Sequence, residues 1–273
     1  MSEQPEHLQP GHLNDDPWQA LKQFTDARIA LGHAGVSLPT KPLLEFQLAH
    51  AQARDAVHNA MDSQRIAAHF HSYNSQVVCS AANDRSTYLQ RPDLGRVLND
   101  ESRQRLQSPA DSAHTASDLT IIIADGLSAT AMNRNAIPFT DALLKQLQNE
   151  LPQINIGAVI VAEQARVALG DDIASLLNSR AVVVLIGERP GLSSPDSLGI
   201  YFTQNPKPGL TDERRNCISN VREAGLSYDD AARRLLYLLN EGQRLGTSGV
   251  SLKDRSDDQP LELNQQEQPF LLR

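Results

Sequence analysis

The sequence predicts an α/β protein in which a mainly helical N-terminal part precedes a doubly wound, mostly parallel sheet. Two observations support this fold class. From Leu119 onward, short apolar runs alternate with helical patterns, which is typical of βαβ units and a parallel sheet. The run at 181–186 is apolar without interruption and stops at Gly187, which is typical of a strand buried on both faces.

The N-terminal side of the chain has mostly helical patterns. Residues 1–15 are polar with two prolines, and we expect a flexible N-terminus there. In the mainly helical part at 16–103, apolar residues recur at three- and four-residue steps, and proline and glycine suggest where helices begin and end. The elements expected here are helices at 17–32, at 43–61 and after Pro92, and a short strand at 76–79.

A change of composition divides the chain. Residues 104–117 are rich in Gln, Ser, Ala and Asp, and we interpret them as a linker. An α/β domain at 118–252 follows, and the tail at 253–273 is polar until its last residues. The expected strands of this domain lie at 119–124, 154–161, 181–186 and 198–203, and its helices at 137–151, 171–177 and 228–245.

Composition excludes several classes of protein. The chain has 273 residues, of which 40% are hydrophobic and 21% charged, as in a soluble globular protein. A net charge of −8 and few aromatic residues argue against binding to nucleic acid or to an anionic membrane. No apolar run is long enough to span a bilayer, and the first residues do not resemble a secretory signal. Two cysteines form neither a disulfide framework nor a metal cluster, and we expect a cytoplasmic protein.

Polar residues collect where three expected strands end, at 125–128, 163–166 and 188–189. Open α/β sheets bind ligands outside the carboxyl ends of their strands, so these residues form a candidate site. The alternative is that Glu188 and Arg189 are solvated turn residues and that Asp125 only forms a turn or caps a helix. None of the three segments contains G-x-G-x-x-G, so a dinucleotide would lack its usual phosphate cradle.

The candidate residues offer little chemistry of their own. All eight histidines precede Leu119, which excludes a histidine-dependent nucleophile or metal site within the α/β domain alone. Arg214 and Arg215 could depress the thiol pKa of Cys217 and so suit a nucleophile, but a lone cysteine is most often a small buried apolar group. Val167 fits the pattern of a core residue. The domain therefore favours ligand binding, or completion of another chain's active site, over stand-alone catalysis.

Several segments together resemble one known family. LTIIIADGLSATA, VVVLIGERPGLSSPDSLGIY and DERRNCISNVREAGLSYDDAA are similar to the small (light) subunit of ethanolamine ammonia-lyase, as are DARIALGHAGVSLPTKPLLEF and YLQRPDLGRVL nearer the N-terminus. The resemblance covers roughly residues 18–252. It implies an adenosylcobalamin-dependent enzyme that converts ethanolamine to acetaldehyde and ammonia by radical chemistry, and a Rossmann-like cobalamin-binding domain in this chain.

The resemblance also implies that two different chains bind the substrate and the cofactor together. A large barrel subunit binds ethanolamine, and the corrin lies between the subunits of a hetero-oligomer. The family positions that contact the cofactor match Val167, Glu188 and Cys217, and no catalytic residue or metal ligand is implied here. Because residues 119–273 contain no histidine to replace the cofactor's own lower ligand, we expect cobalamin to stay base-on.

Some expectations concern location and assembly. Some family members begin with an amphipathic helix that directs them into a bacterial microcompartment, but residues 1–15, with Pro5 and Pro10, do not support such a helix. The large subunit could carry the address instead. We expect the N-terminal helices to contribute to the subunit interface, because they have limited room for a core of their own. The alternatives are a Rossmann-like oxidoreductase, a purely structural partner subunit, and an α/β ligand-binding module unrelated to cobalamin.

Overall fold

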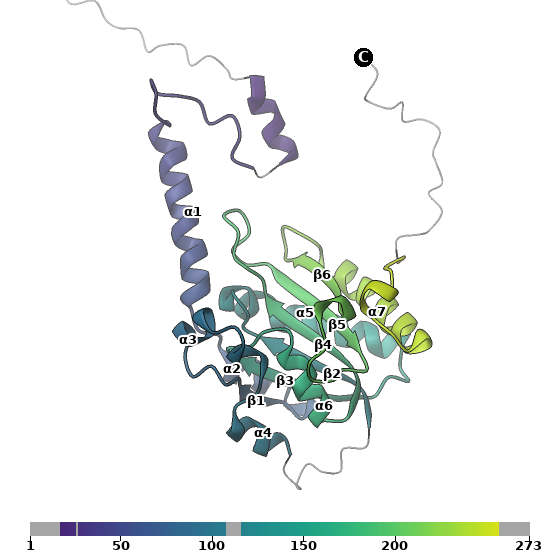
Figure 1. The fold of residues 1–273 in the computed structure, drawn as a ribbon. Coiled ribbons are helices and arrows are strands. Elements are labelled where there is room, and N and C mark those ends of the chain that lie inside the picture. Colours follow the sequence, from purple (N-terminus) through teal and green to yellow (C-terminus); the bar gives the residue numbers. More distant parts are fainter. Residues whose placement is uncertain (1–16, 26, 108–115, 257–273) are drawn as a thin grey trace, which may run out of the picture.

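The computed structural model describes residues 17–25, 27–107 and 116–256 (Figure 1). A six-stranded sheet in the order β1-β3-β2-β4-β5-β6 lies at its centre. The strands are β1 (Gln76–Cys79), β2 (Ser117–Ala124), β3 (Ile156–Glu163), β4 (Ser179–Gly187), β5 (Leu198–Gln204) and β6 (Asn216–Val221). The α-helices are α1 (Thr40–His58), α2 (Ser63–His69), α3 (Arg85–Gln90), α4 (Asp100–Leu106), α5 (Ala129–Glu150), α6 (Leu169–Leu176) and α7 (Tyr228–Leu245). Short 3₁₀ helices are η1 (Pro17–Phe24), η2 (His71–Tyr73), η3 (Leu94–Arg96), η4 (Asp212–Arg214) and η5 (Gly249–Ser251).

The sheet is mixed but mostly parallel, which confirms the predicted α/β class. Strands β1, β3, β2 and β4 run parallel, whereas β5 and β6 pair antiparallel to their neighbours. No helix separates β4 from β5, so the chain turns back as a hairpin, because a parallel crossover needs a longer connection. The sequence analysis did not find β6. Only Ile218 and Val221 are buried in this edge strand, which leaves no continuous apolar run to detect.

Helices cover both faces of the sheet and create two cores. On one face, α2, α5 and α7 pack over Ile121, Val183 and other alternate strand residues. On the other face, α4 and α6 pack over Ile122, Val182 and their alternate neighbours. Strand β4 contributes residues to both cores, and for this reason its sequence is apolar at every position from Ala181 to Ile186 rather than at every second one.

Strand order places a crevice at the carboxyl edge of the sheet. Strands β3 and β4 flank β2 on opposite sides, and the helices that connect them, α5 and α6, lie on opposite faces. The connections therefore diverge next to β2, as they do at the topological switch point where open α/β sheets bind ligands. The turns that follow β2, β3 and β4 meet at this edge.

Two long helices are confirmed, and the first predicted helix is wrong. The expected segments at 43–61 and 228–245 correspond to α1 and α7. In place of a helix at 17–32, the 3₁₀ helix η1 ends at Phe24. Ala30 and Gly32 have positive φ angles of 51° and 73°, so the backbone leaves the right-handed helical region there despite the apolar spacing.

Two other helix boundaries differ from the prediction. The helix expected directly after Pro92 lies before it as α3, and only the single turn of η3 lies between Pro92 and the start of α4 at Asp100. Asp84 caps α3 by accepting a hydrogen bond from the Thr87 amide, and proline disfavours helical geometry at the preceding residue. Helix α5 begins at Ala129 rather than at residue 137, because Ser128 caps it and Pro138 is accommodated inside the helix.

The N-terminal part shares the sheet with the α/β part. Strand β1 was expected and is confirmed, and it pairs in parallel with β3. Helix α4 runs into the segment expected to be a linker, of which residues 108–115 lie outside the described residues. The expected flexible N-terminus at 1–15 and most of the tail at 253–273 also lie outside them. The division at 104–117 stays a prediction.

Candidate functional site

An open cavity of about 450 Å³ lies at the carboxyl edge of the sheet. It contains residues from the turns after β2, β3 and β4, which confirms that polar strand ends converge there. Its lining is Tyr88, Gly126, Leu127, Arg166, Val167, Ile186, Gly187, Glu188, Arg189 and Tyr201. Of the three predicted cofactor-contacting residues, Val167 and Glu188 line the cavity directly, and Cys217 lies opposite the lining residue Tyr201 on the next strand.

Two glycines allow the floor of the cavity to close. Gly126 has a φ angle of +57°, and a Cβ atom there would lie 2.3 Å from the carbonyl oxygen of Gly187. A Cβ atom on Gly187 would in turn lie 2.1 Å from the carbonyl oxygen of Ser128. The turn after β2 therefore packs its backbone directly against the end of β4, which only glycine permits.

Asp125 shapes the turn after β3 from inside the protein. Its carboxylate accepts hydrogen bonds from the amides of Gln164 and Ala165, both at 2.9 Å, and its side chain is almost fully buried. Burial raises the pKa of Asp125 to about 6, although the amides and Arg85 oppose this rise. Asp125 therefore has a structural role: it holds the backbone that leads into Val167.

Residues from the N-terminal part form one wall of the cavity. The guanidinium groups of Arg85 and Arg166 lie 4.8 Å and 4.3 Å from the ring centroid of Tyr88. The Tyr88 hydroxyl donates to the carbonyl of Ala165 at 3.0 Å. Among the described residues, the buried Nη2 of Arg85 and Nε of Arg166 have no hydrogen-bond partner. Of these two arginines, Arg166 lines the cavity, whereas Arg85 packs on the Tyr88 ring and does not line it.

Glu188 reaches across β5 toward β6. Its Oε2 accepts a hydrogen bond from the Asn220 amide at 3.2 Å. Gly199 on β5 makes room for it, since a Cβ atom at that position would lie 3.0 Å from Oε1. A carboxylate can accept about four hydrogen bonds, so Glu188 keeps capacity for a ligand in the cavity. The alternative of a fully solvated turn residue is wrong for Glu188, which is half-buried and bonded, whereas Arg189 is exposed.

Cys217 lies on β6 directly opposite Tyr201 and shares its face of the sheet. Its side chain is exposed, yet surrounding protein and the Glu188 charge raise the thiol pKa, while a hydrogen bond from Tyr201 opposes the rise. The expected depression by neighbouring arginines is therefore wrong. Arg215 is buried and binds both carboxylate oxygens of Asp171, at 2.8 and 2.7 Å, so its charge is neutralised away from the thiol.

Sequence analysis missed two residues that line the cavity, Tyr88 and Tyr201, and also Arg85, which packs on the Tyr88 ring. No local signal marks Tyr88 or Arg85, because they come from α3: Arg85 contacts Asp125, 40 residues later, and Tyr88 contacts Ala165, 77 residues later. Tyr201 sits in a strand that was predicted, but its position beside Glu188 depends on the antiparallel pairing of β4 with β5.

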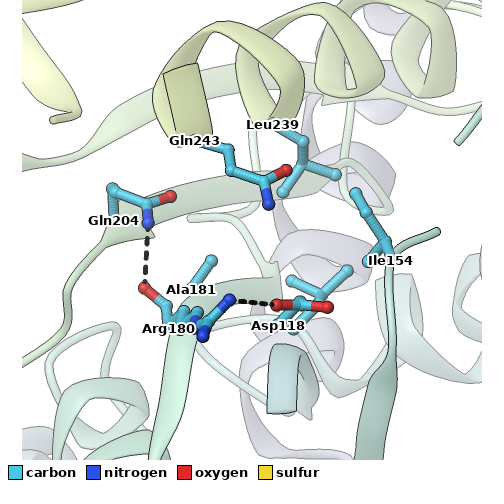
Figure 2. A pocket seen from close by; sticks show the side chains of 8 residues that line it. Asp118, Ile154, Arg180, Ala181, Gln204, Leu239 and Gln243 are labelled. Carbon is cyan, nitrogen blue, oxygen red and sulfur yellow. Dashed lines mark hydrogen bonds and ion pairs between the residues drawn. The ribbon is translucent and has the colours of Figure 1, made fainter. Parts of the chain in front are cut away.

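A second hollow at the opposite, amino edge of the sheet is a poor candidate site. Figure 2 shows it between Asp118, Arg180 and Gln204 below and Leu239 and its neighbours on α7 above. Its cavity volume is only about 20 Å³, enough for a single water molecule. Its polar groups already bind one another: Arg180 pairs with Asp118 at 3.1 Å, and Gln204 donates to the Arg180 carbonyl at 3.2 Å.

The fold and the cavity define an α/β protein with a candidate ligand site at the switch point of its sheet. Comparison with known proteins identifies the family. The model of the ethanolamine ammonia-lyase light chain family matches residues 15–253. The chain belongs to this family, as the sequence resemblance predicted.

Curated relatives agree with this assignment. Three examples follow, each named ethanolamine ammonia-lyase small subunit. The Pseudomonas fluorescens Pf0-1 protein is 54% identical over 249 residues, covering 90% of each chain. The Pseudomonas syringae pv. tomato protein is 52% identical over 265 residues, covering 96% of this chain and 92% of the relative. The Pseudomonas aeruginosa UCBPP-PA14 protein is 53% identical over 258 residues, covering 94% and 93%. Within the described residues, no helix has the length and apolar character needed to cross a membrane.

Proposed function

We propose that this chain is the small subunit of an adenosylcobalamin-dependent ethanolamine ammonia-lyase and that it binds the cofactor at the interface with the large subunit. The family assignment supports the enzyme and its two-subunit composition. The observation that supports the location of the cofactor is the cavity at the carboxyl edge, around which Val167, Glu188 and Cys217 gather from three separate segments. The α/β part at 118–252 is then a Rossmann-like cofactor-binding domain.

The residues present fit a corrin with amide side arms. Val167, Leu127 and Ile186 offer apolar contact to a broad, mostly apolar ring. Glu188 accepts hydrogen bonds from amide N–H groups, and the guanidinium groups of the lining residues Arg166 and Arg189 can donate to carbonyl or phosphate oxygens. Because the cavity is open on one side, this chain would hold one part of the cofactor and leave another part for a second protein.

This chain's own residues bind and orient rather than react. Val167 supplies van der Waals area, Glu188 fixes the orientation of the amide arms, and Cys217 packs as a small polarizable group. When bound, adenosylcobalamin supplies the radical through homolysis of its cobalt–carbon bond. Since the sequence from Leu119 onward has no histidine, no histidine of this domain could replace the cofactor's own lower ligand, which supports the proposal that cobalamin would bind base-on. The large subunit binds ethanolamine and catalyses its conversion to acetaldehyde and ammonia.

The cytoplasm is the location we propose, on the basis of composition and the two cysteines. Residues 1–15, where an amphipathic targeting helix would lie, are outside the described residues, and location within a bacterial microcompartment could instead depend on an address carried by the large subunit.

A spectroscopic titration tests the proposal. Adenosylcobalamin is titrated by ultraviolet–visible absorption with this chain, with the large subunit, and with the two mixed. We expect tight binding and ethanolamine-dependent cobalt–carbon cleavage only in the mixture, and no deamination by this chain alone. A mixture that binds no cobalamin, or turnover of ethanolamine by the isolated chain, would contradict the proposal.

Substitution of Glu188 tests the role of this chain in binding the cofactor. Loss of one charge-assisted hydrogen bond costs about 1.5–3 kcal/mol, so Glu188→Ala is expected to weaken cobalamin binding by the assembled enzyme about 10- to 150-fold. The matched control is Glu150→Ala, at the exposed end of α5. Unchanged affinity in Glu188→Ala would favour a purely structural partner subunit.

A further inference from the structure

The N-terminal arm, which we define as the described residues of 17–58, carries most of the exposed apolar side chains of this protein. Nine of the thirteen large apolar side chains that are exposed among the described residues belong to it. Trp18 is 63% exposed and Phe24 is 78% exposed. Single exposed apolar residues are ordinary on protein surfaces, but a concentration of this kind marks a surface that binds another molecule.

Helix α1 illustrates why the arm requires a partner. Within this 19-residue helix only Ala49 and Ala56 are buried. Leu44 and Leu48 lie one turn apart on the same side and are 57% and 60% exposed. Most of the stability of a protein helix comes from packing its apolar face against other elements. The free chain does not provide that packing along most of α1.

Hydrogen bonds connect the C-terminal end of the arm to the candidate cofactor cavity. Arg85 donates to the Val57 carbonyl at 2.6 Å and to the Gly126 carbonyl, in the cavity floor, at 2.9 Å. Beyond the end of α1, the Asn59 side chain donates to the Thr130 hydroxyl of α5 at 3.1 Å. These contacts set the direction in which α1 extends from the sheet, past its carboxyl edge (Figure 1).

Farther along, the arm meets the segment that follows β4. The Arg28 guanidinium donates to the Leu192 carbonyl at 3.3 Å and lies 5.9 Å from the centroid of the Phe46 ring. Leu192 is itself exposed and follows Glu188 and Arg189 of the cavity lining by a few residues. Figure 1 shows the loop between β4 and β5 beside α1. The arm, this loop and the mouth of the cavity therefore form one continuous surface.

We propose that the large subunit docks on the apolar surface of the N-terminal arm and on the adjoining loop after β4, and so covers the cavity mouth. This inference rests on the proposed function, which already requires the large subunit at that mouth. Two other occupants fit less well. Residues 1–16 contain only Met1, Leu8 and Leu13 as large apolar residues, too few to cover the arm. A second copy of this chain docked there would cover the cavity mouth and exclude the large subunit from it.

Paired substitutions in the full chain test the docking surface. Leu44→Lys/Leu48→Lys places two charges on the exposed row of α1 with a residue that forms helices well. The matched control, Leu245→Lys/Val250→Lys, changes two exposed apolar residues at the end of α7 and in η5. We expect the α1 variant to bind the large subunit at least 10-fold more weakly in isothermal titration, and the control to bind like the wild type. Circular dichroism is expected to show the wild-type helix content in both variants.

Four outcomes would overturn the docking proposal. They are wild-type affinity in the α1 variant, an equal loss in both double variants, a dimer of the isolated chain that the α1 variant disperses, and tighter binding of the large subunit after residues 1–16 are removed. The proposed function fails separately. If the assembled wild-type pair binds no adenosylcobalamin while its assembly depends on Leu44 and Leu48, the cofactor proposal is wrong and the docking surface stands.

Discussion

Substitution of Asp125 gives a quantitative prediction about the edge of the sheet. Its pKa of about 6 in the folded protein compares with about 4 for an unfolded aspartate. The folded state therefore binds this proton more tightly than the unfolded state. The stability linked to the proton is fully present below about pH 4 and is lost as the pH rises through about 6. The pKa difference corresponds to about 3 kcal/mol.

Asp125→Asn removes this titration and keeps the size of the side chain. We expect the free energy of unfolding of the variant to rise by about 3 kcal/mol relative to the wild type between pH 4 and pH 7. Urea denaturation at a series of pH values measures this difference, and equal m-values in the two proteins are the control for a common unfolded state. A difference that does not change with pH would refute the reasoning. A change of opposite sign would mean that Arg85 and the amides of Gln164 and Ala165 stabilise the carboxylate by more than burial destabilises it.

Two further predictions concern β6 and its surroundings. Asp171→Ala leaves the buried Arg215 charge without its main partner and is expected to lower the free energy of unfolding by about 3–5 kcal/mol. Asp212→Ala removes an exposed partner of the same arginine and is expected to lower the free energy of unfolding by less than about 1 kcal/mol. Equal losses in urea denaturation would contradict this ranking. Cys217, although exposed, is expected to react with iodoacetamide with a pH midpoint above that of a free cysteine. Glu188→Gln is expected to lower that midpoint, because it removes a negative charge that raises the thiol pKa. Rapid alkylation at pH 7 would contradict the raised pKa.

Local sequence patterns correctly predicted the elements whose pattern arises from their own burial. Strand β4 is apolar at every position from Ala181 to Ile186 because both of its faces are covered, and the apolar stripe of α7 packs on one face of the sheet. Both signals can be read within one short segment. The convergence of three strand ends also followed from the sequence, because parallel strands joined by helices bring their carboxyl ends to one edge.

The predictions from sequence were wrong where the structure of a segment depends on residues far away in the chain. The apolar spacing at 17–32 indicated a helix, but most of those side chains are exposed in the described structure and make no core. Strand β6 has two buried residues and was missed, because its register is set by β5 rather than by its own hydrophobicity. The two arginines beside Cys217 in sequence suggested a low thiol pKa, yet the charge of Arg215 is neutralised by Asp171 of helix α6.

The sequence by itself determined the α/β class and the family, and through the family resemblance it predicts three residues that contact a cofactor: Val167, Glu188 and Cys217. Only the tertiary structure decided that Tyr88 and Arg166 line the cavity, with Arg85 packed on the Tyr88 ring, and that Tyr201 lies in the sheet between Val184 and Cys217. The physical reason is that the hydrophobic periodicity of a segment depends on which of its faces is buried. The order of apolar and polar residues within the segment is enough to show this. Contacts across strands and the pKa of a buried group depend on residues far apart in the chain, and folding alone brings these together.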